Sequence, residues 1–273
     1  MNVLTVDLED IYDSLLSKNV APNSYNVSKR VKQLLDVFAH NGIKATFFVV
    51  GAFALRNEEL VYEISKHYDI GSHGYSHDLA GKMTAAEFEK DLQQSLKTLS
   101  DITKKDIVKY RSPGFSLCKR EYIDILAKNG IETDCSLSAM KHSFGQKVLS
   151  SAVPCRLECE NNKIIKELPP CIVRFAGMNI GFNGGGYLRT LPYGLIKRNM
   201  NANDYNLVYI HPYDFETNQP KTGNRTFVRR IKSRAGVKTM QTKLNKLIRD
   251  FEFTDVATAV EQIDWQKTKI ISI

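Results

Sequence analysis

Short apolar runs alternate with amphipathic segments along almost the whole chain, and this alternation constrains the fold more than any other feature. The clearest runs are Leu4–Asp7, Ile43–Gly51 and Asn206–Ile210. The second is too apolar to face water on either side, which is typical of a strand buried in a parallel sheet. About seven repeats of strand and helix favour parallel strands joined by right-handed crossovers, and hence an α/β fold.

Capping and turn residues indicate where the helices begin and end. Asn26 or Ser28 can cap a helix that ends before Asn41-Gly42, and Thr84 with Glu87 has the spacing of a capping box. We predict further helices over 58–66, 119–128, 191–200 and 237–249. We predict further strands over 68–70, 107–110, 131–133, 164–168, 171–175 and 251–254.

The composition is that of a globular protein with a proper core. The chain has 273 residues, of which 42% are hydrophobic and 25% charged. Its longest mostly apolar run, 45–55, is shorter than the ~18 residues of a membrane span, and its first residues do not resemble a signal peptide. Five cysteines without framework spacing fit a reducing compartment, so we expect free thiols and a cytoplasmic protein.

The net charge of +8 comes from one segment. Residues 219–249 contain ten Lys or Arg and no acid, which leaves 28 basic and 30 acidic residues elsewhere, a net charge of −2. This basic segment is either a solvated face or a contact for an anionic phosphate or the inner face of a membrane. We expect no nucleic-acid partner, since no recognition motif accompanies the segment.

Side chains capable of chemistry follow the ends of five predicted strands. They are Asp7 with Glu9 and Asp10, His73 with His77, Arg111, Asp134, and His211. In a barrel, the loops after parallel strands share one face, where active sites are built. An open doubly wound sheet would also gather them at one edge, but the chain has neither a G-x-G-x-x-G after its first strand nor a P-loop.

The spacing of His73 and His77 suits a pair of metal ligands. In a helical turn, residues four apart lie on one face and can hold one ion from one side. An isolated pair of this kind is often only a surface or capping feature. With one carboxylate after the first strand, however, the pair would form a two-His, one-carboxylate face with open positions.

Such a face activates water and polarises a carbonyl, and the reaction then needs a base and an acid. Asp7 can be the base, with Arg111 holding it ionised. His211 can be the acid, because the pKa of histidine is easily brought near 7. Asp134 either orients Arg111 or a histidine, or caps its turn. These groups suffice to hydrolyse an amide or ester.

At these motifs the sequence resembles the polysaccharide deacetylase superfamily, whose members share the NodB-homology domain. The similar segments follow one another in order along nearly the whole chain. They are 5–10 with a D-x-E-D motif, 72–77 with S-H-x-x-x-H, 111–115 with R-x-P, 134–136, 184–193 and 210–214. The first and the last two are similar to a branch found in bacterial exopolysaccharide loci.

The resemblance implies a distorted (β/α)7 TIM-like barrel, a single domain over residues 1–273, and removal of N-acetyl groups from amino sugars. It implies Asp7 as base, His211 as acid, and His73 and His77 as ligands of one divalent metal. Zinc is the expected metal, with Co, Ni, Fe or Mn as alternatives. The expected substrate is an N-acetylated sugar, a nucleotide-sugar or a lipid-linked glycan in surface polysaccharide biosynthesis.

Two positions depart from the family pattern. Leu8 stands where the family has a second, metal-binding aspartate, so the ligand must shift to Glu9 or Asp10. Strand alternation returns Glu9 to the side of Asp7, and its longer side chain can reach the metal, which favours Glu9. The R-x-P motif of the family often continues directly with an aromatic residue, but here Gly114 stands between Pro113 and Phe115. The resemblance therefore leaves open which backbone N–H contacts the oxyanion.

We expect substrate contacts from two glycine-containing loops and from nearby aromatic residues. These are Gly114, Phe115, Gly185, Gly186, Tyr187 and Tyr213. Two alternative functions stay open. One is a metal-dependent amidohydrolase acting on a non-sugar amide, and the other is a catalytically silent carbohydrate-binding protein. Metal content and acetate release would distinguish them.

Overall fold

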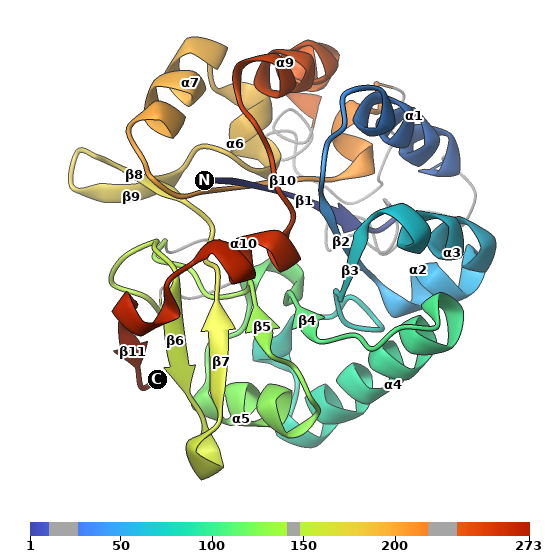
Figure 1. Cartoon of the computed structure of the whole chain (residues 1–273), viewed down its shortest axis with the longest axis vertical. Coiled ribbons are helices and arrows are strands. Elements are labelled where there is room, and N and C mark those ends of the chain that lie inside the picture. The colour runs from blue at the N-terminus through green and yellow to red at the C-terminus, as the bar shows by residue number, and fades with distance from the viewer. Residues whose placement is uncertain (11–26, 141–147, 218–233) are drawn as a thin grey trace.

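A nine-stranded sheet runs through the computed structural model, which describes residues 1–10, 27–140, 148–217 and 234–273 (Figure 1). Seven strands lie side by side and parallel to their neighbours. In spatial order they are β10 (Asn206–Ile210), β1 (Asn2–Leu8), β2 (Thr46–Val49), β3 (Asp69–Ser72), β4 (Lys109–Tyr110), β5 (Thr133–Asp134) and β7 (Ile164–Glu167). Beyond β7 lie the antiparallel β6 (Cys155–Glu158) and then β11 (Ile270–Ile271).

Helices follow most of these strands along the chain. They are α1 (Val27–His40), α2 (Gly51–Arg56), α3 (Glu58–His67), α4 (Ala85–Thr103), α5 (Arg120–Lys128), α6 (Gly185–Thr190), α7 (Tyr193–Asn201), α9 (Val237–Asp250) and α10 (Val256–Gln262). Helices α1 to α5 lie around the outside of the strands, and α10 lies across the middle of the view in Figure 1. The capping box at α4 is confirmed, because Thr84 and Glu87 each accept a hydrogen bond from the other's backbone N–H. The α/β class is likewise confirmed.

Closure of the strands into a (β/α)7 barrel stays a prediction. In the described part of the chain, the strand order begins at β10 and ends at β11, with no ladder joining these two. The strand expected over 251–254 is wrong. Thr254 makes only an isolated bridge to Val3, because Asp255 caps α10 immediately afterwards and turns the chain into a helix.

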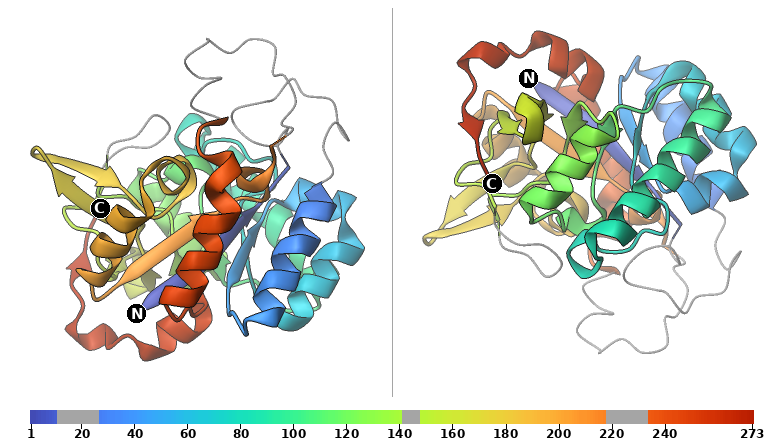
Figure 2. Two further views of the ribbon diagram at one scale, coloured as in Figure 1. Left: turned by 90° about the horizontal axis from the view of Figure 1, so that it is seen from above. Right: turned by 90° about the horizontal axis from the view of Figure 1, so that it is seen from below.

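The strand expected over 171–175 exists but lies outside the main sheet. It is β8 (Ile172–Phe175), which pairs only with β9 (Met178–Gly181) in a two-stranded sheet. The turn between them has positive φ at Ala176 and Gly177, 47° and 80°. Figure 2 shows this hairpin projecting from the side of the molecule.

Two buried clusters hold the helices against the sheet. The first joins β1 and β2 to α1, α9 and α10, with Val3, Phe38, Phe47, Leu244 and Val256 at its centre. The second joins α4 and α5 to β6 and β7, with Phe88, Tyr122, Leu126, Leu157 and Ile165. Together they fix the carboxyl ends of the parallel strands, where the polar residues lie.

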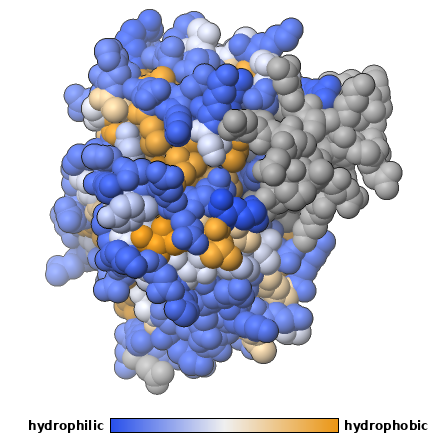
Figure 3. All heavy atoms as spheres, turned by 90° about the vertical axis from the view of Figure 1, so that its right-hand side faces the viewer, coloured by the Kyte–Doolittle hydropathy of each residue, from blue (hydrophilic) through white to orange (hydrophobic). Residues whose placement is uncertain are grey.

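The surface shown in Figure 3 is mainly hydrophilic, with small separate apolar patches. Among the described helices, none has both the length and the hydropathy of a membrane span. Residues 218–233 lie outside the described chain, so about half of the 219–249 basic segment is not placed. Within α9, Lys243 is buried and the Arg249 Nε atom lies 2.8 Å from Asp250 Oδ1, so these two cations are already partnered.

Candidate active site

A cavity of about 210 Å³ lies at the carboxyl ends of the parallel strands. Five of the side chains with predicted chemical roles line it, namely Asp7, Glu9, His73, His77 and His211. All six expected substrate contacts line it as well: Gly114, Phe115, Gly185, Gly186, Tyr187 and Tyr213. Residues from five separate loops and strand ends therefore converge on one space.

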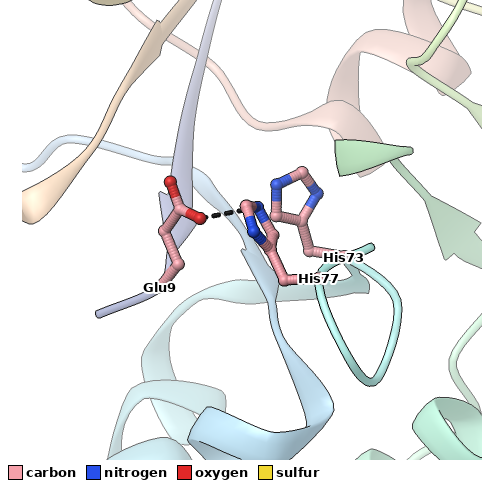
Figure 4. A group of neighbouring side chains, drawn as sticks. All are labelled: Glu9, His73 and His77. Carbon is pink, nitrogen blue, oxygen red and sulfur yellow. Dashed lines mark ion pairs between the residues drawn. The ribbon is translucent and has the colours of Figure 1, made fainter. Parts of the chain in front are cut away.

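Glu9, His73 and His77 form a cluster with the composition of a metal site (Figure 4). All three are buried, and one potential ligand atom of each lies within 4.8 Å of the others. The His77 Nε2 atom lies 2.6 Å from Glu9 Oε2. Asp10 is buried too but does not belong to this group, so the structure places Glu9 with the histidines.

The two histidines meet through a loop and not, as expected, through a helical turn. His73 follows β3 directly, and the chain then takes left-handed conformations at Gly74 (φ 73°) and His77 (φ 59°). The Asp91 carboxylate of α4 anchors the loop by accepting hydrogen bonds from the N–H groups of residues 75 and 76, at 2.7 and 2.9 Å. The ring centroids of the histidines lie 5.0 Å apart. A positive φ at a histidine is uncommon, and here it brings the second imidazole back to the first.

The protonation states in this cluster fit a divalent metal. Burial lowers the pKa of His73 to about 4, so its imidazole is neutral, and its Nδ1 lies 2.7 Å from the Arg111 carbonyl oxygen. With Nδ1–H donating to that carbonyl, Nε2 keeps its lone pair. Burial raises the pKa of Glu9, but the charge and hydrogen bond of His77 outweigh this and lower it. Glu9 Oε2 and His77 Nε2, which lie 2.6 Å apart in this buried cluster, are both potential ligand atoms for one ion.

Asp7 is held by a fully buried arginine. The Arg111 Nη1 atom donates to Asp7 Oδ1 at 2.7 Å and to Thr5 Oγ1 at 2.8 Å, and the guanidinium lies 4.3 Å from the Phe48 ring centroid. Burial raises the pKa of Asp7, but the charges of Arg111 and of nearby histidines hold it below its usual value. The other carboxylate oxygen, Oδ2, lies 3.7 Å from His211 Nε2. Asp7 is therefore an ionised acid with one oxygen directed to the histidine side of the cavity.

His211 lines the same cavity as the Glu9–His73–His77 cluster, and Asp214 fixes its imidazole on the Nδ1 side. Its Nδ1 lies 2.9 Å from Asp214 Oδ2, and its ring stacks on Tyr213, whose hydroxyl donates to Glu9 Oε1 at 2.9 Å. Burial lowers the pKa of His211, but the charge and hydrogen bond of Asp214 outweigh this and raise it to about 9. Sequence analysis gave Asp214 no role. The available signal was its position three residues after His211, where its carboxylate also accepts the His211 N–H.

Among the described residues, Asp134 lies outside the cavity lining and makes no hydrogen bond or ion pair with Arg111 or a histidine. It accepts a hydrogen bond from Ser136 Oγ at 2.5 Å and lies beside Glu167, its neighbour in the β5–β7 register. Arg111 instead donates hydrogen bonds through Nε and Nη1 to the Cys135 carbonyl, Thr5 and Asp7. The expectation that Asp134 orients Arg111 or a histidine is therefore corrected: it caps its own turn, and Glu167, which sequence analysis did not single out, is its partner.

Comparison with known families agrees with this geometry. Residues 15–133 match the sequence profile of the family described as "Polysaccharide deacetylase", and residues 135–261 match a "Domain of unknown function (DUF3473)". Residues 15–133 are therefore similar in sequence to polysaccharide deacetylases. Over 108 residues, the chain is 29% identical to a peptidoglycan deacetylase from Helicobacter pylori, a match that covers 39% of this chain and 36% of that protein. The matched region is thus about a third of the relative's length.

Solved structures share the fold of this chain. One is a Mycobacterium smegmatis protein assigned to the polysaccharide deacetylases, with a TM-score of 0.67 and 18% identity over 100% of this chain and 93% of that one. Another is a CE4 family pseudoenzyme from Bacillus anthracis, with a TM-score of 0.51 and 14% identity over 99% of this chain and 66% of that one. At these identities the likeness shows the fold alone, so the chemistry has to be argued from the site.

The two family matches meet at the cavity. The deacetylase match supplies His73, His77 and Arg111, whereas the DUF3473 segment, residues 135–261, supplies His211 and the groups around it. The DUF3473 segment also supplies β10 and β7, which pair with β1 and β5 on the two sides of the five-strand row β1–β5. Neither segment contains the whole site.

Proposed function

We propose that this chain is a metal-dependent deacetylase that removes N-acetyl groups from an amino sugar or glycan intermediate in surface polysaccharide biosynthesis. The observation that carries the proposal is the gathering of the Glu9–His73–His77 cluster with Asp7 and His211 in one cavity. We propose one catalytic domain over residues 1–273, in which the seven parallel strands form a distorted (β/α)7 barrel.

Glu9, His73 and His77 would hold one divalent ion. Two imidazoles and a carboxylate are a ligand set that catalytic zinc sites use, so zinc is our first choice. When bound, the metal supplies a lowered pKa for a water molecule and polarisation of the acetyl carbonyl.

The chain's own residues would move the protons. Asp7, kept ionised by Arg111, accepts a proton from the attacking water, and His211 Nε2 gives a proton to the departing nitrogen. The amide C–N bond breaks, and acetate and a free amine leave. Gly114 lines the cavity, and its N–H makes no hydrogen bond in the described chain, so it is our candidate donor to the oxyanion.

The cavity walls suit a sugar ring. Phe115, Tyr187 and Tyr209 contribute aromatic faces, and Tyr187 is 37% exposed. A free, nucleotide-linked or lipid-linked N-acetylated sugar would present its acetyl group to the cluster. We further propose that the protein works in the cytoplasm, where the 219–249 basic segment would meet a phosphate or the inner membrane face.

Metal content and acetate release test the proposal. Wild type, Asp7→Asn and His73→Ala would be assayed on free, nucleotide-linked and oligomeric N-acetylated sugars. We expect about one metal ion per chain in wild type and Asp7→Asn, loss of metal in His73→Ala, and a fall in acetate release of about 10²–10⁴-fold in Asp7→Asn. Metal binding without acetate release from any sugar would contradict the substrate class. A wild-type chain that binds no added metal would contradict the mechanism.

A further inference from the structure

Asp214 fixes His211 with only one of its two carboxylate oxygens. Oδ2 accepts hydrogen bonds from the His211 backbone N–H and from Nδ1, both at 2.9 Å. This holds the imidazole by one nitrogen and directs Nε2 to Asp7 and Glu9, at 3.7 and 3.8 Å. Asp214 itself is 1% exposed. A carboxylate buried to this extent needs a counter-charge that does not depend on the histidine.

Arg189 provides that counter-charge. Its Nε atom lies 3.1 Å from Asp214 Oδ1, and the arginine side chain is 8% exposed. The two atoms form an ion pair, but their geometry is not that of a hydrogen bond in the described part of the chain. The charge of Arg189 adds to that of His211 in lowering the pKa of Asp214 against the effect of burial. A row of three groups therefore runs from Arg189 through Asp214 to His211.

The backbone that carries Arg189 is itself held in place by α9. The buried Lys243 Nζ atom donates to the carbonyl oxygens of Leu188, Arg189 and Leu191, at the end of α6. Gly236, the residue before α9, passes so close that a Cβ atom there would lie 2.0 Å from the Arg189 carbonyl oxygen. The position of Arg189 is thus set by the packing of α6 against α9, and the first turn of α6 lines the cavity through Gly185, Gly186 and Tyr187.

We propose that Arg189 is a positioning residue for the acid of the reaction: it holds Asp214, which in turn holds His211 with Nε2 towards the cavity. This inference rests on the proposed function for its kinetic consequences. It also assigns a role to the DUF3473 segment, because Arg189, Asp214, His211 and Lys243 all lie within residues 135–261. In this chain that segment supplies His211 as the acid of the site and the residues that hold it in position.

A double-mutant cycle tests the route through Asp214. We expect Asp214→Asn to lower kcat by about tenfold to a hundredfold and Arg189→Met to lower it by about tenfold, with KM and metal content unchanged. In the double variant, Arg189→Met should cause no further loss, because the group through which it acts is already gone. Arg189→Lys, which keeps the charge, should recover part of kcat. Losses that multiply in the double variant would overturn the proposal.

Arg30→Met is the matched control. Arg30 pairs with Glu216 at 3.1 Å, two residues after Asp214, and contacts no group of the site. We expect it to leave kcat unchanged. A fall in kcat equal to that of Arg189→Met would show a general disturbance of the 212–216 region and would overturn the specific role of Arg189.

A second readout does not depend on catalysis. In the full chain labelled with ¹⁵N-histidine, the His211 Nδ1–H proton should exchange slowly in wild type and Arg189→Lys, faster in Arg189→Met, and fastest in Asp214→Asn. Equal exchange in wild type and Arg189→Met would overturn the proposal. If the exchange order holds but wild type releases no acetate, the positioning role stands and the proposed deacetylase function fails.

Discussion

Two pairs of acids lie buried at strand ends in this molecule, and their pKa values are shifted in opposite directions. Asp7 and Glu9 at the end of β1 are each 2% exposed, and Asp134 and Glu167 on β5 and β7 are 0% exposed. The first pair contacts Arg111 and histidines, and the pKa values of both acids are lowered. The second pair makes no ion pair in the described part of the chain, and burial raises the pKa of Asp134 to about 6 and that of Glu167 well above its usual value.

The comparison shows that burial alone does not make a functional carboxylate. Burial raises the pKa in both pairs, and nearby positive charge outweighs this effect only in the first pair. The Asp7–Glu9 pair can accept a proton or bind a metal. The Asp134–Glu167 pair, with Leu137 N–H donating to Glu167 Oε1 at 3.1 Å, instead connects β5 to β7.

The same substitution in each pair should therefore have very different effects on activity, and this is the largest difference we expect. Glu9→Gln removes an anionic ligand and should abolish metal retention and acetate release. Glu167→Gln replaces an acid whose pKa burial raises well above its usual value by a neutral group of the same shape, so kcat should stay within about twofold of wild type and metal content should be unchanged. Metal analysis and an acetate assay check both. Equal losses in the two variants would remove the distinction between the pairs.

Removal of the counter-charge should have the next largest effect. Arg111→Met leaves Asp7 buried without its arginine, and breaking a buried pair in this way costs about 3–5 kcal/mol of unfolding free energy. Lys97→Met is the control, since Lys97 pairs with Asp101 at 2.6 Å on the surface, where such a pair contributes at most about 1 kcal/mol. Urea unfolding at neutral pH measures both. A similar small change in the two variants would show that Arg111 does not compensate Asp7.

The smallest expected effect is a pH dependence that belongs to the Asp134–Glu167 pair. Because the folded-state pKa of each acid is raised, the folded chain binds more protons than the unfolded chain above pH ~4, so this pair lowers stability as pH rises through about 6. Glu167→Gln removes one of these acids and keeps a donor for Asp134. Its unfolding free energy relative to wild type should therefore rise by about 1 kcal/mol or more between pH ~4 and ~8. A difference that does not vary with pH would contradict the raised pKa values.

The sequence predicted the parts of the site that depend on local order along the chain. Buried parallel strands end next to Asp7, His73 and His211. Because parallel strands all point in the same direction, their carboxyl ends bring such positions together at one end of the sheet. The partner of Asp134 could not be found in this way, because Glu167 reaches it only through the register of β7 against β5. The loop geometry of His77 was also hidden, since the H-x-x-x-H spacing suggests a helix and a left-handed histidine has no sequence signal.

The arrangement of β10 and β7 limits how this chain can be divided. A cut between Asp134 and Cys135, at the border of the two family matches, would leave the first fragment with β1 and β5 as bare edges of its sheet. Unpaired edges of this kind recruit strands from other molecules. Each fragment would then depend on the other to fold, so split expression should yield intact protein only when both pieces are made together, and neither piece is a unit that could be grafted onto another protein alone.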